Sequence, residues 1–162
     1  MTSDAATWAT FTAAEPDLAR TVEDRFGQHT HHVLATLRKD GSPRTSGLEV
    51  RFLDGEFWLA MMPGSLKARD LLRDPRFAIQ ANPGEGMTMG GGDARISGRA
   101  HLVEDPATIA RYTDQVPVPN PDDFHLFRTE LTEVTRTSIE DDKYLVVQVW
   151  TPGEAVRVMK RT

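Results

Sequence analysis

The chain has 162 residues, a formal net charge of -5 and no cysteine. A chain of this length suits one domain, and folding buries about 70% of the surface that the unfolded chain exposes. The absence of cysteine excludes disulfide frameworks, thiolate metal sites and cysteine nucleophiles. Acidic and basic residues are interspersed, without the basic patch that nucleic-acid binding requires, so we expect no nucleic-acid partner.

The N-terminus shows no targeting signal. Residues 1–4 lack the basic and apolar regions of a secretory signal, and no apolar run reaches the ~20 residues that cross a bilayer. We therefore expect a cytoplasmic protein without a membrane partner.

Residues 8–26 follow a helical pattern in two segments. Pro16 suits the first turn of the second segment, and Trp8 gives the first segment an apolar side. The second segment carries apolar residues every four positions: Leu18, Val22 and Phe26. We expect residues 1–28 to form a helical segment packed on the barrel described below or against a partner chain.

Three of the five histidines stand between residues 28 and 32. His29 and His31 would share a face of an extended chain, which is one way to form a metal pair. No carboxylate is placed to complete the metal shell. We interpret these residues as a polar lead into a strand and expect no metal.

Residues 33–61 predict three short strands joined by tight turns. Apolar residues alternate with polar ones in residues 33–37, 44–53 and 57–61, the pattern of half-buried strands. Asp40-Gly41 and Asp54-Gly55 mark the turns, because glycine tolerates the positive φ that such turns need. This β-meander needs a further layer to cover its apolar face.

Ser65 predicts the start of a helix over residues 66–73, which Asp74-Pro75 ends. Lys67 places a positive charge in the first turn, where the helix dipole favours a negative one. A bound phosphate would remove this conflict, because free N–H groups, the dipole and the lysine would face one anion. The alternative is a serine cap beside a solvated lysine.

The rest of the chain predicts more strands than helices. Strands are expected over residues 77–81, 95–103, 124–139, 144–150 and 155–160, with a short helix from Pro106 to about Tyr112. Gly98 predicts a bulge within its strand. The glycine-rich connection 83–92 matches neither a dinucleotide fingerprint nor a phosphate loop. Residues 116–121, with three prolines, predict a stiff crossing. About eight strands favour a closed antiparallel barrel.

Two stretches resemble the pyridoxamine 5′-phosphate oxidase-like flavin-binding split-barrel family. The first is the meander followed by Ser65-x-Lys67 and a helix closed by Asp74-Pro75-Arg76. The second is Trp150, a glycine-containing turn, and two arginines four residues apart, Arg157 and Arg161. The resemblance runs from about residue 32 to 162. It implies a mainly β, split antiparallel barrel in a single domain of residues 1–162.

The resemblance also implies a homodimer with a flavin nucleotide, FMN or a deazaflavin, in a groove between the subunits. Phosphate contacts would be Ser65 and Lys67, helped by Arg69. The residues expected along the flavin ring are Leu48, Glu49, Val50, Arg51 and Met61. Trp150 and Arg161 would close the site from the neighbouring chain, where Arg157 would contact substrate. Three apolar side chains are expected to be covered between the chains: Trp8, Phe11 and Trp150.

Several positions depart from the family pattern. Ser46 stands where the family has a leading arginine, Arg51 where it has a closing lysine, and Leu66 where it has a basic residue. A glutamine that contacts the ring falls at Asp93, and an ionised carboxylate cannot donate to a flavin carbonyl. These departures argue against pyridoxamine-phosphate oxidation and leave flavin binding.

The resemblance therefore implies an oxidoreductase that transfers hydride between FMN or a deazaflavin and a small organic substrate. The cofactor performs the difficult step, so no dedicated acid–base pair is required. Two other classes stay open. One is a non-catalytic protein that holds a flavin or haem, with His101 or His125 as the iron ligand. The other is an empty barrel that serves protein contacts.

Overall fold

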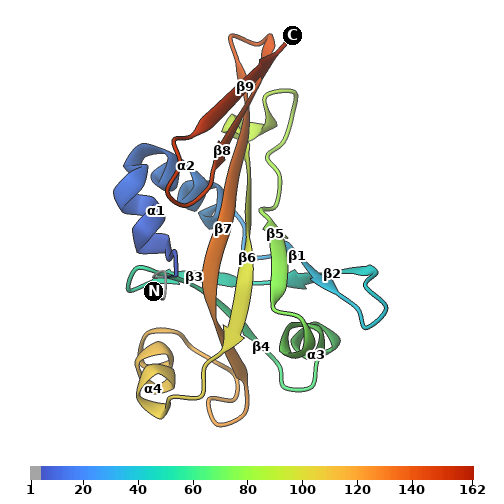
Figure 1. Ribbon diagram of the computed structural model, residues 1–162, viewed down its shortest axis with the longest axis vertical. Coiled ribbons are helices and arrows are strands. Elements are labelled where there is room, and N and C mark those ends of the chain that lie inside the picture. Colours follow the sequence, from blue (N-terminus) through green and yellow to red (C-terminus); the bar gives the residue numbers. More distant parts are fainter. Residues whose placement is uncertain (1–4) are drawn as a thin grey trace.

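The computed structural model describes residues 5–162, which form nine β-strands, four α-helices and one short 3-10 helix (Figure 1). All nine strands belong to one sheet, and every pair is antiparallel. The predicted mainly β architecture is therefore confirmed. Residues 1–4, which the sequence indicates are not a secretory signal, lie outside the described residues. None of the described helices is long and apolar enough to cross a membrane.

The strands, in chain order, are β1 (His32–Leu37), β2 (Pro43–Leu48), β3 (Val50–Leu53), β4 (Glu56–Met61), β5 (Arg76–Gln80), β6 (Asp93–Leu102), β7 (His125–Glu140), β8 (Tyr144–Trp150) and β9 (Arg157–Arg161). The helices are α1 (Trp8–Ala14), α2 (Pro16–Gly27), α3 (Leu66–Arg73), α4 (Pro106–Gln115) and the 3-10 helix η1 (Met89–Gly91).

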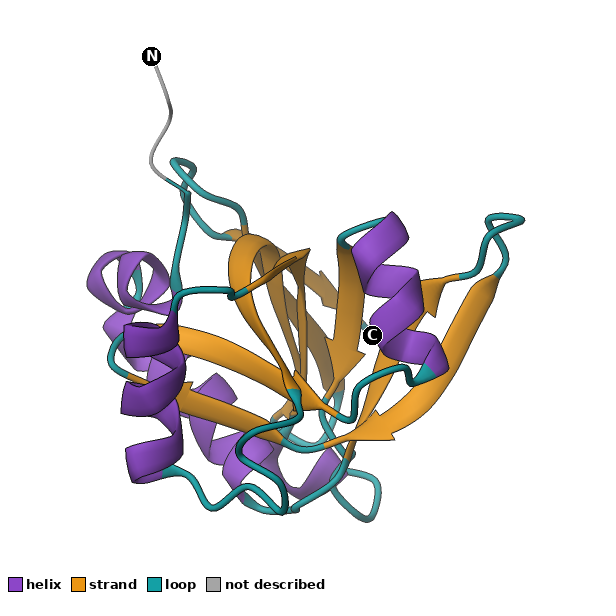
Figure 2. Cartoon of the chain, turned by 90° about the horizontal axis from the view of Figure 1, so that it is seen from below, coloured by secondary structure: helices purple, strands orange, loops and turns teal. Residues whose placement is uncertain are grey.

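The sheet closes on itself at Glu49. Its strand order is β2-β1-β5-β6-β7-β4-β3, and the two end strands follow each other in sequence with Glu49 between them. The prediction of a single strand over residues 44–53 is wrong, because its first half pairs with β1 and its second half with β4. Figure 2 shows the strands curving around a common centre, with the helices outside them.

The barrel is split along β7. One edge of β7 pairs with β6, while the other edge pairs first with β4 and later with β8. Between the stretches that pair with β4 and β8, the same edge of β7 bonds to the N-terminal segment: the Leu131 N–H donates to the Ala6 carbonyl at 2.8 Å. The Ala9 N–H of α1 donates to the Gly55 carbonyl at 2.8 Å. The N-terminal segment and α1 thus fill the split.

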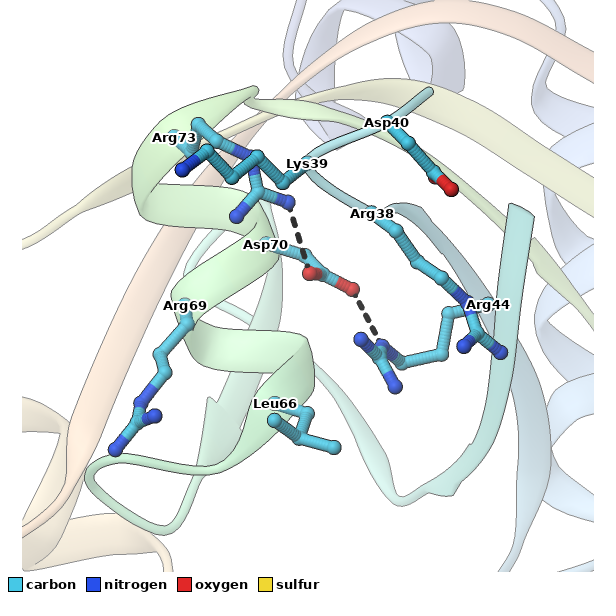
Figure 3. A pocket seen from close by; sticks show the side chains of 8 residues that line it. All are labelled: Arg38, Lys39, Asp40, Arg44, Leu66, Arg69, Asp70 and Arg73. Carbon is cyan, nitrogen blue, oxygen red and sulfur yellow. Dashed lines mark hydrogen bonds and ion pairs between the residues drawn. The ribbon is translucent and has the colours of Figure 1, made fainter. Parts of the chain in front are cut away.

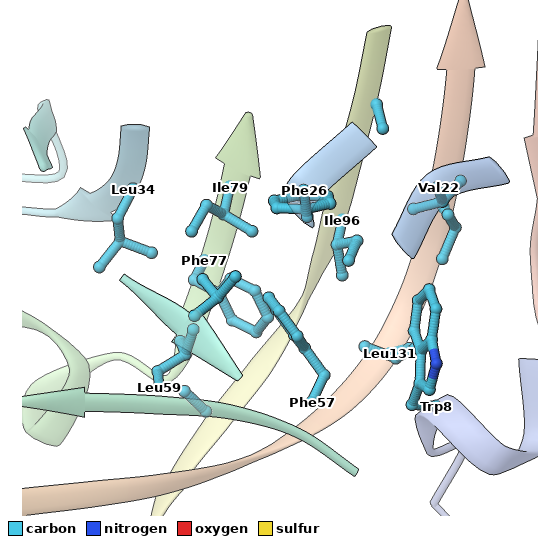
Figure 4. Close-up of a cluster of buried hydrophobic side chains, with 14 of the residues drawn as sticks. Trp8, Val22, Phe26, Leu34, Phe57, Leu59, Phe77, Ile79, Ile96 and Leu131 are labelled. Atoms are coloured by element: carbon cyan, nitrogen blue, oxygen red, sulfur yellow. The ribbon is translucent and has the colours of Figure 1, made fainter. Parts of the chain in front are cut away.

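Aromatic residues of α1 and α2 complete the core. Figure 4 shows Trp8, Val22 and Phe26 among the buried barrel side chains. Phe11 is fully buried, and its ring lies 4.7 Å from that of Trp150, which is 1% exposed. The expectation that Trp8, Phe11 and Trp150 are covered by a second chain is therefore wrong, because their own chain buries them.

The bulge predicted at Gly98 is confirmed. The register between β6 and β7 shifts between Ser97 and Gly98. A Cβ atom at Gly98 would lie 2.0 Å from the Glu130 carbonyl oxygen, so no larger residue fits without a shift of the backbone. Glycine therefore allows β7 to pass close to β6 here.

Candidate functional site

A groove of about 800 Å³ lies where β2 meets β3. Its walls come from this junction, the end of β4, the first turn of α3 and the segment that follows α4. Six of the residues that the resemblance implies for a cofactor line it together: Leu48, Glu49, Arg51, Met61, Ser65 and Lys67. Residues far apart in sequence thus meet here because the barrel closes at Glu49.

The junction gives the groove a polar edge. Glu49 lies between two basic side chains, with His31 Nε2 at 3.5 Å from its Oε1 and Arg51 Nη2 at 3.4 Å from its Oε2. The second terminal nitrogen of Arg51 donates to the Val50 carbonyl at 3.1 Å. The Val50 side chain itself is buried in the core, so only its backbone faces this edge.

The opposite wall is apolar and stiff. It consists of Tyr112 at the end of α4, Phe124 before β7, and residues 116–119 between them. Pro117 and Pro119 fix the backbone of this wall, because the proline ring restricts φ. Burial raises the pKa of Tyr112, whose ring stacks on Phe124 with centroids 6.2 Å apart. The sequence indicated a stiff crossing here, but not its role as a groove wall.

The first turn of α3 forms the cationic end of the groove. The Ser65 hydroxyl accepts a hydrogen bond from the Ala68 N–H at 3.3 Å, which confirms the predicted cap. Lys67 Nζ donates to the Gly47 carbonyl at 2.8 Å, and burial lowers the pKa of this lysine. An ammonium group has three donors, so this contact leaves two for a ligand. Within residues 5–162 no carboxylate forms an ion pair with Lys67.

Ser46 of β2 carries an unpaired polar atom but does not line the groove. It precedes Gly47, and its hydroxyl is buried without a hydrogen-bond partner among the described residues. A buried hydroxyl without a partner is costly. The sequence identified Ser46 only as a departure from the family arginine, and its burial was not predictable from the pattern.

Five residues that the resemblance implies for the site do not line the groove of their own chain: Val50, Arg69, Trp150, Arg157 and Arg161. Arg69 lies on α3 but lines a separate cavity. Trp150 has no free surface for a ligand, so its assignment as a cofactor contact is corrected. Arg157 and Arg161 are exposed on β9. Figure 1 shows β9 at the opposite end of the molecule from α3 and α4. Only a second chain could bring these two arginines to the groove.

The histidines considered for haem also lie elsewhere. His101 is exposed and lies 3.8 Å from Glu130, and the His125 ring packs 6.1 Å from that of Phe127. Neither lines the groove, whereas His31 does. Across residues 5–162, no three histidine, aspartate or glutamate side chains form a cluster that could hold a metal ion.

Comparisons with known proteins agree with this architecture. The family model described as pyridoxamine 5′-phosphate oxidase matches residues 18–138. Among solved structures, an FMN-binding protein from Nostoc punctiforme, described as pyridoxamine 5′-phosphate oxidase-related, is similar with a TM-score of 0.65 and 16% identity. The alignment covers 91% of this chain and 96% of that one. A search of curated protein sequences found no match.

Two further structures show how varied the similar proteins are. PhzG from Burkholderia lata, solved with tetrahydrophenazine-1-carboxylic acid, has a TM-score of 0.63 at 16% identity and covers 93% of this chain and 91% of its own. HutZ, a haem storage protein from Vibrio cholerae, has a TM-score of 0.52 at 18% identity, and the alignment covers 73% of this chain and 89% of HutZ. At such identities the likeness shows the fold alone.

Proposed function

Because the chain belongs to the pyridoxamine 5′-phosphate oxidase family, we propose that it binds a flavin nucleotide, FMN or a deazaflavin, in the groove beside α3. We further propose that it is an oxidoreductase acting on a small organic substrate. The observation that carries the proposal is the presence in one groove of an apolar wall and an ammonium group, that of Lys67, with two unused donors.

The residues present fit such a ligand. A volume of about 800 Å³ lies within the usual range of small-molecule sites. Tyr112, Pro117 and Met61 offer apolar surface to a flat ring system, and Lys67 with Ser65 offers donors to a phosphate.

When bound, the flavin supplies hydride transfer, and the protein supplies binding and orientation. Lys67 and Ser65 would hold the phosphate, and the segment from Leu48 to Arg51 would contact the ring system. The apolar wall excludes water from the ring face, which strengthens every polar contact at the site. A small substrate enters on the open side of the groove.

A homodimer would complete the site. A second copy could place its exposed strand β9 over the groove and supply Arg157 and Arg161 in trans. Apolar side chains are available for such a contact: Val158 is 61% exposed on β9, and Met62 is 76% exposed beside the groove. Guanidinium groups suit the phosphate and the ring oxygens of a flavin.

The test is FMN binding by fluorescence quenching in two variants of α3. Lys67→Ala should weaken binding about ten- to a hundredfold, since a charge-assisted hydrogen bond contributes roughly 1.5–3 kcal/mol. Arg69→Ala is the matched control, because it removes one positive charge from the same helix, and Arg69 does not line the groove. Equal affinities in wild type and Lys67→Ala would show that the lysine is not a phosphate ligand.

A second candidate is a protein that holds haem or flavin without turnover. The observation that favours it is His31, which lines the groove with a side chain that is 71% exposed. Imidazole can ligate haem iron. Added haem would then give a Soret band that His31→Ala shifts or abolishes. No such band, together with oxidation of bound reduced flavin by an organic acceptor faster than that of free flavin, would favour the enzyme.

A further inference from the structure

A second cavity lies on the other side of α3, between this helix and the turn that joins β1 to β2 (Figure 3). We call it the basic hollow, with a volume of about 580 Å³. Five cationic side chains and two carboxylates line it, which leaves a formal surplus of three positive charges in a chain whose net charge is -5. The cations are Arg38, Lys39, Arg44, Arg69 and Arg73.

Asp70 fixes part of this charge in place. Its side chain is only 3% exposed, and it accepts hydrogen bonds from Arg44 Nε at 2.7 Å, Arg73 Nη2 at 2.9 Å and Thr36 Oγ1 at 2.8 Å. Arg73 Nη2 also donates to the Leu37 carbonyl at 2.7 Å. The two guanidinium groups are therefore held at the wall of the hollow before any ligand arrives.

Donors remain unused after these bonds. Arg44 donates to Asp70 through Nε alone, so its two terminal nitrogens have no partner among the described residues. The Arg38 side chain forms no hydrogen bond or ion pair within residues 5–162. In Figure 3 the Arg44 side chain extends toward Asp70 and the Arg38 side chain extends toward Arg44, whereas Arg69 extends away from both.

The second carboxylate, Asp40, offsets one of the positive charges, and the surplus of three already includes it. Asp40 accepts hydrogen bonds from the Ser42 N–H at 2.9 Å and the Ser42 hydroxyl at 2.6 Å, within its own turn. Arg38 and Arg44 line the same hollow, and like charges in one hollow repel each other unless an anion lies between them. Planar forks with free N–H groups are the preferred partners of phosphate and carboxylate oxygens.

We propose that the basic hollow binds a small oxyanion, a phosphate or carboxylate group, through Arg38 and Arg44. The site is separate from the lysine at the groove, because Ser65 and Lys67 face the groove while Leu66 lines the hollow. The oxyanion could be the acidic end of a long ligand that also occupies the groove, or it could belong to a free multivalent anion. Neither source requires that the groove ligand be a flavin.

The experiment is calorimetric titration of the full chain with inorganic diphosphate. Arg38→Ala should weaken binding about ten- to a hundredfold without loss of stability, since Arg38 holds nothing in the fold. Arg44→Gln should weaken it as well, with folding checked by thermal unfolding. Arg20→Ala is the control, because it removes an exposed arginine from α2, and binding should not change.

A repeat of the titration with saturating FMN identifies the source of the oxyanion. Competition would show that the acidic end of the groove ligand occupies the hollow, and independent binding would show a separate anion. Arg38→Ala should weaken diphosphate binding by the same factor in a Lys67→Ala background, so failure of flavin binding does not affect this result. The proposal is overturned if wild type does not bind diphosphate, or if Arg38→Ala and Arg20→Ala weaken binding equally.

Discussion

Helices cover two sides of the barrel by different means. On one side α1 and α2 pack with aromatic rings, such as Phe11 against Trp150. On the other side hydrogen bonds attach α3 to β1 and β2. Asp70 accepts from Thr36 and Arg44, and Arg73 donates to the Leu37 carbonyl. Figure 1 shows these helices at opposite sides of the sheet.

The difference indicates where ligands can bind. Ring packing buries the largest aromatic side chains of the α1 side. Polar attachment leaves donors beside open space, because Lys67 and Arg44 each use one donor on the chain and keep others free. The groove and the basic hollow both adjoin the first turn of α3. Stability therefore resides mainly on the α1 side and binding on the α3 side.

The largest expected effect comes from Phe11→Ala. Phe11 is fully buried, and removal of its ring leaves a cavity against Trp150. The free energy of unfolding should fall by about 3–5 kcal/mol. Urea denaturation would measure this change. FMN affinity should stay the same where the variant is folded, because the groove does not include this ring.

Leu72→Ala is the matched control for that prediction. Leu72 lies on α3 and is 53% exposed, so its truncation should change stability by about 0.5 kcal/mol or less. If the two variants unfold at the same urea concentration, the aromatic packing of α1 does not stabilise the barrel in the way described here.

The positions of most strands and helices were predictable from the sequence, but which strands pair and which distant side chains pack together were not. The alternation of apolar residues predicted the strands, and Ser65 predicted the start of α3, because these signals are local. The change of partner at Glu49 leaves no local trace, since Leu48 and Val50 are both buried and continue the same alternation. The burial of Trp150 depends on Phe11, at the far end of the sequence, and no pattern within either segment indicates that contact.

Asp70→Asn tests the polar attachment of α3. Burial acts to raise the pKa of Asp70, but hydrogen bonds from Arg44, Thr36 and Arg73 outweigh it and hold the pKa below its ordinary value of 3.8. The folded state therefore binds fewer protons than the unfolded state, and the stabilising contribution is present above pH 3.8. Near neutral pH the variant should lose about 1.5–3 kcal/mol of unfolding free energy.

The difference in unfolding free energy between wild type and Asp70→Asn should disappear as the pH falls through the folded-state pKa of Asp70, because the wild-type side chain then becomes neutral as well. Urea denaturation of both proteins over a pH series would measure it. Asp17→Asn is the control, since Asp17 is 90% exposed and its pair with Arg20 should contribute about 0–1 kcal/mol. A gap between wild type and Asp70→Asn that widens toward acid would contradict the assignment.

The smallest expected effects concern β9, the region farthest from both helices that border the groove. If a second chain places β9 over the groove, Arg161→Ala should weaken FMN binding about tenfold, or about 1.4 kcal/mol, because one forked donor is lost. Arg157→Ala should keep FMN affinity and slow the oxidation of bound reduced flavin by small carbonyl, quinone or conjugated-ring acceptors, since only substrate positioning is lost. Light scattering should show a dimer at micromolar concentration in all three proteins. Unchanged affinity and oxidation rate in both variants of a confirmed dimer would place β9 outside the site and leave the groove to be closed by α3 and the proline-rich wall of its own chain.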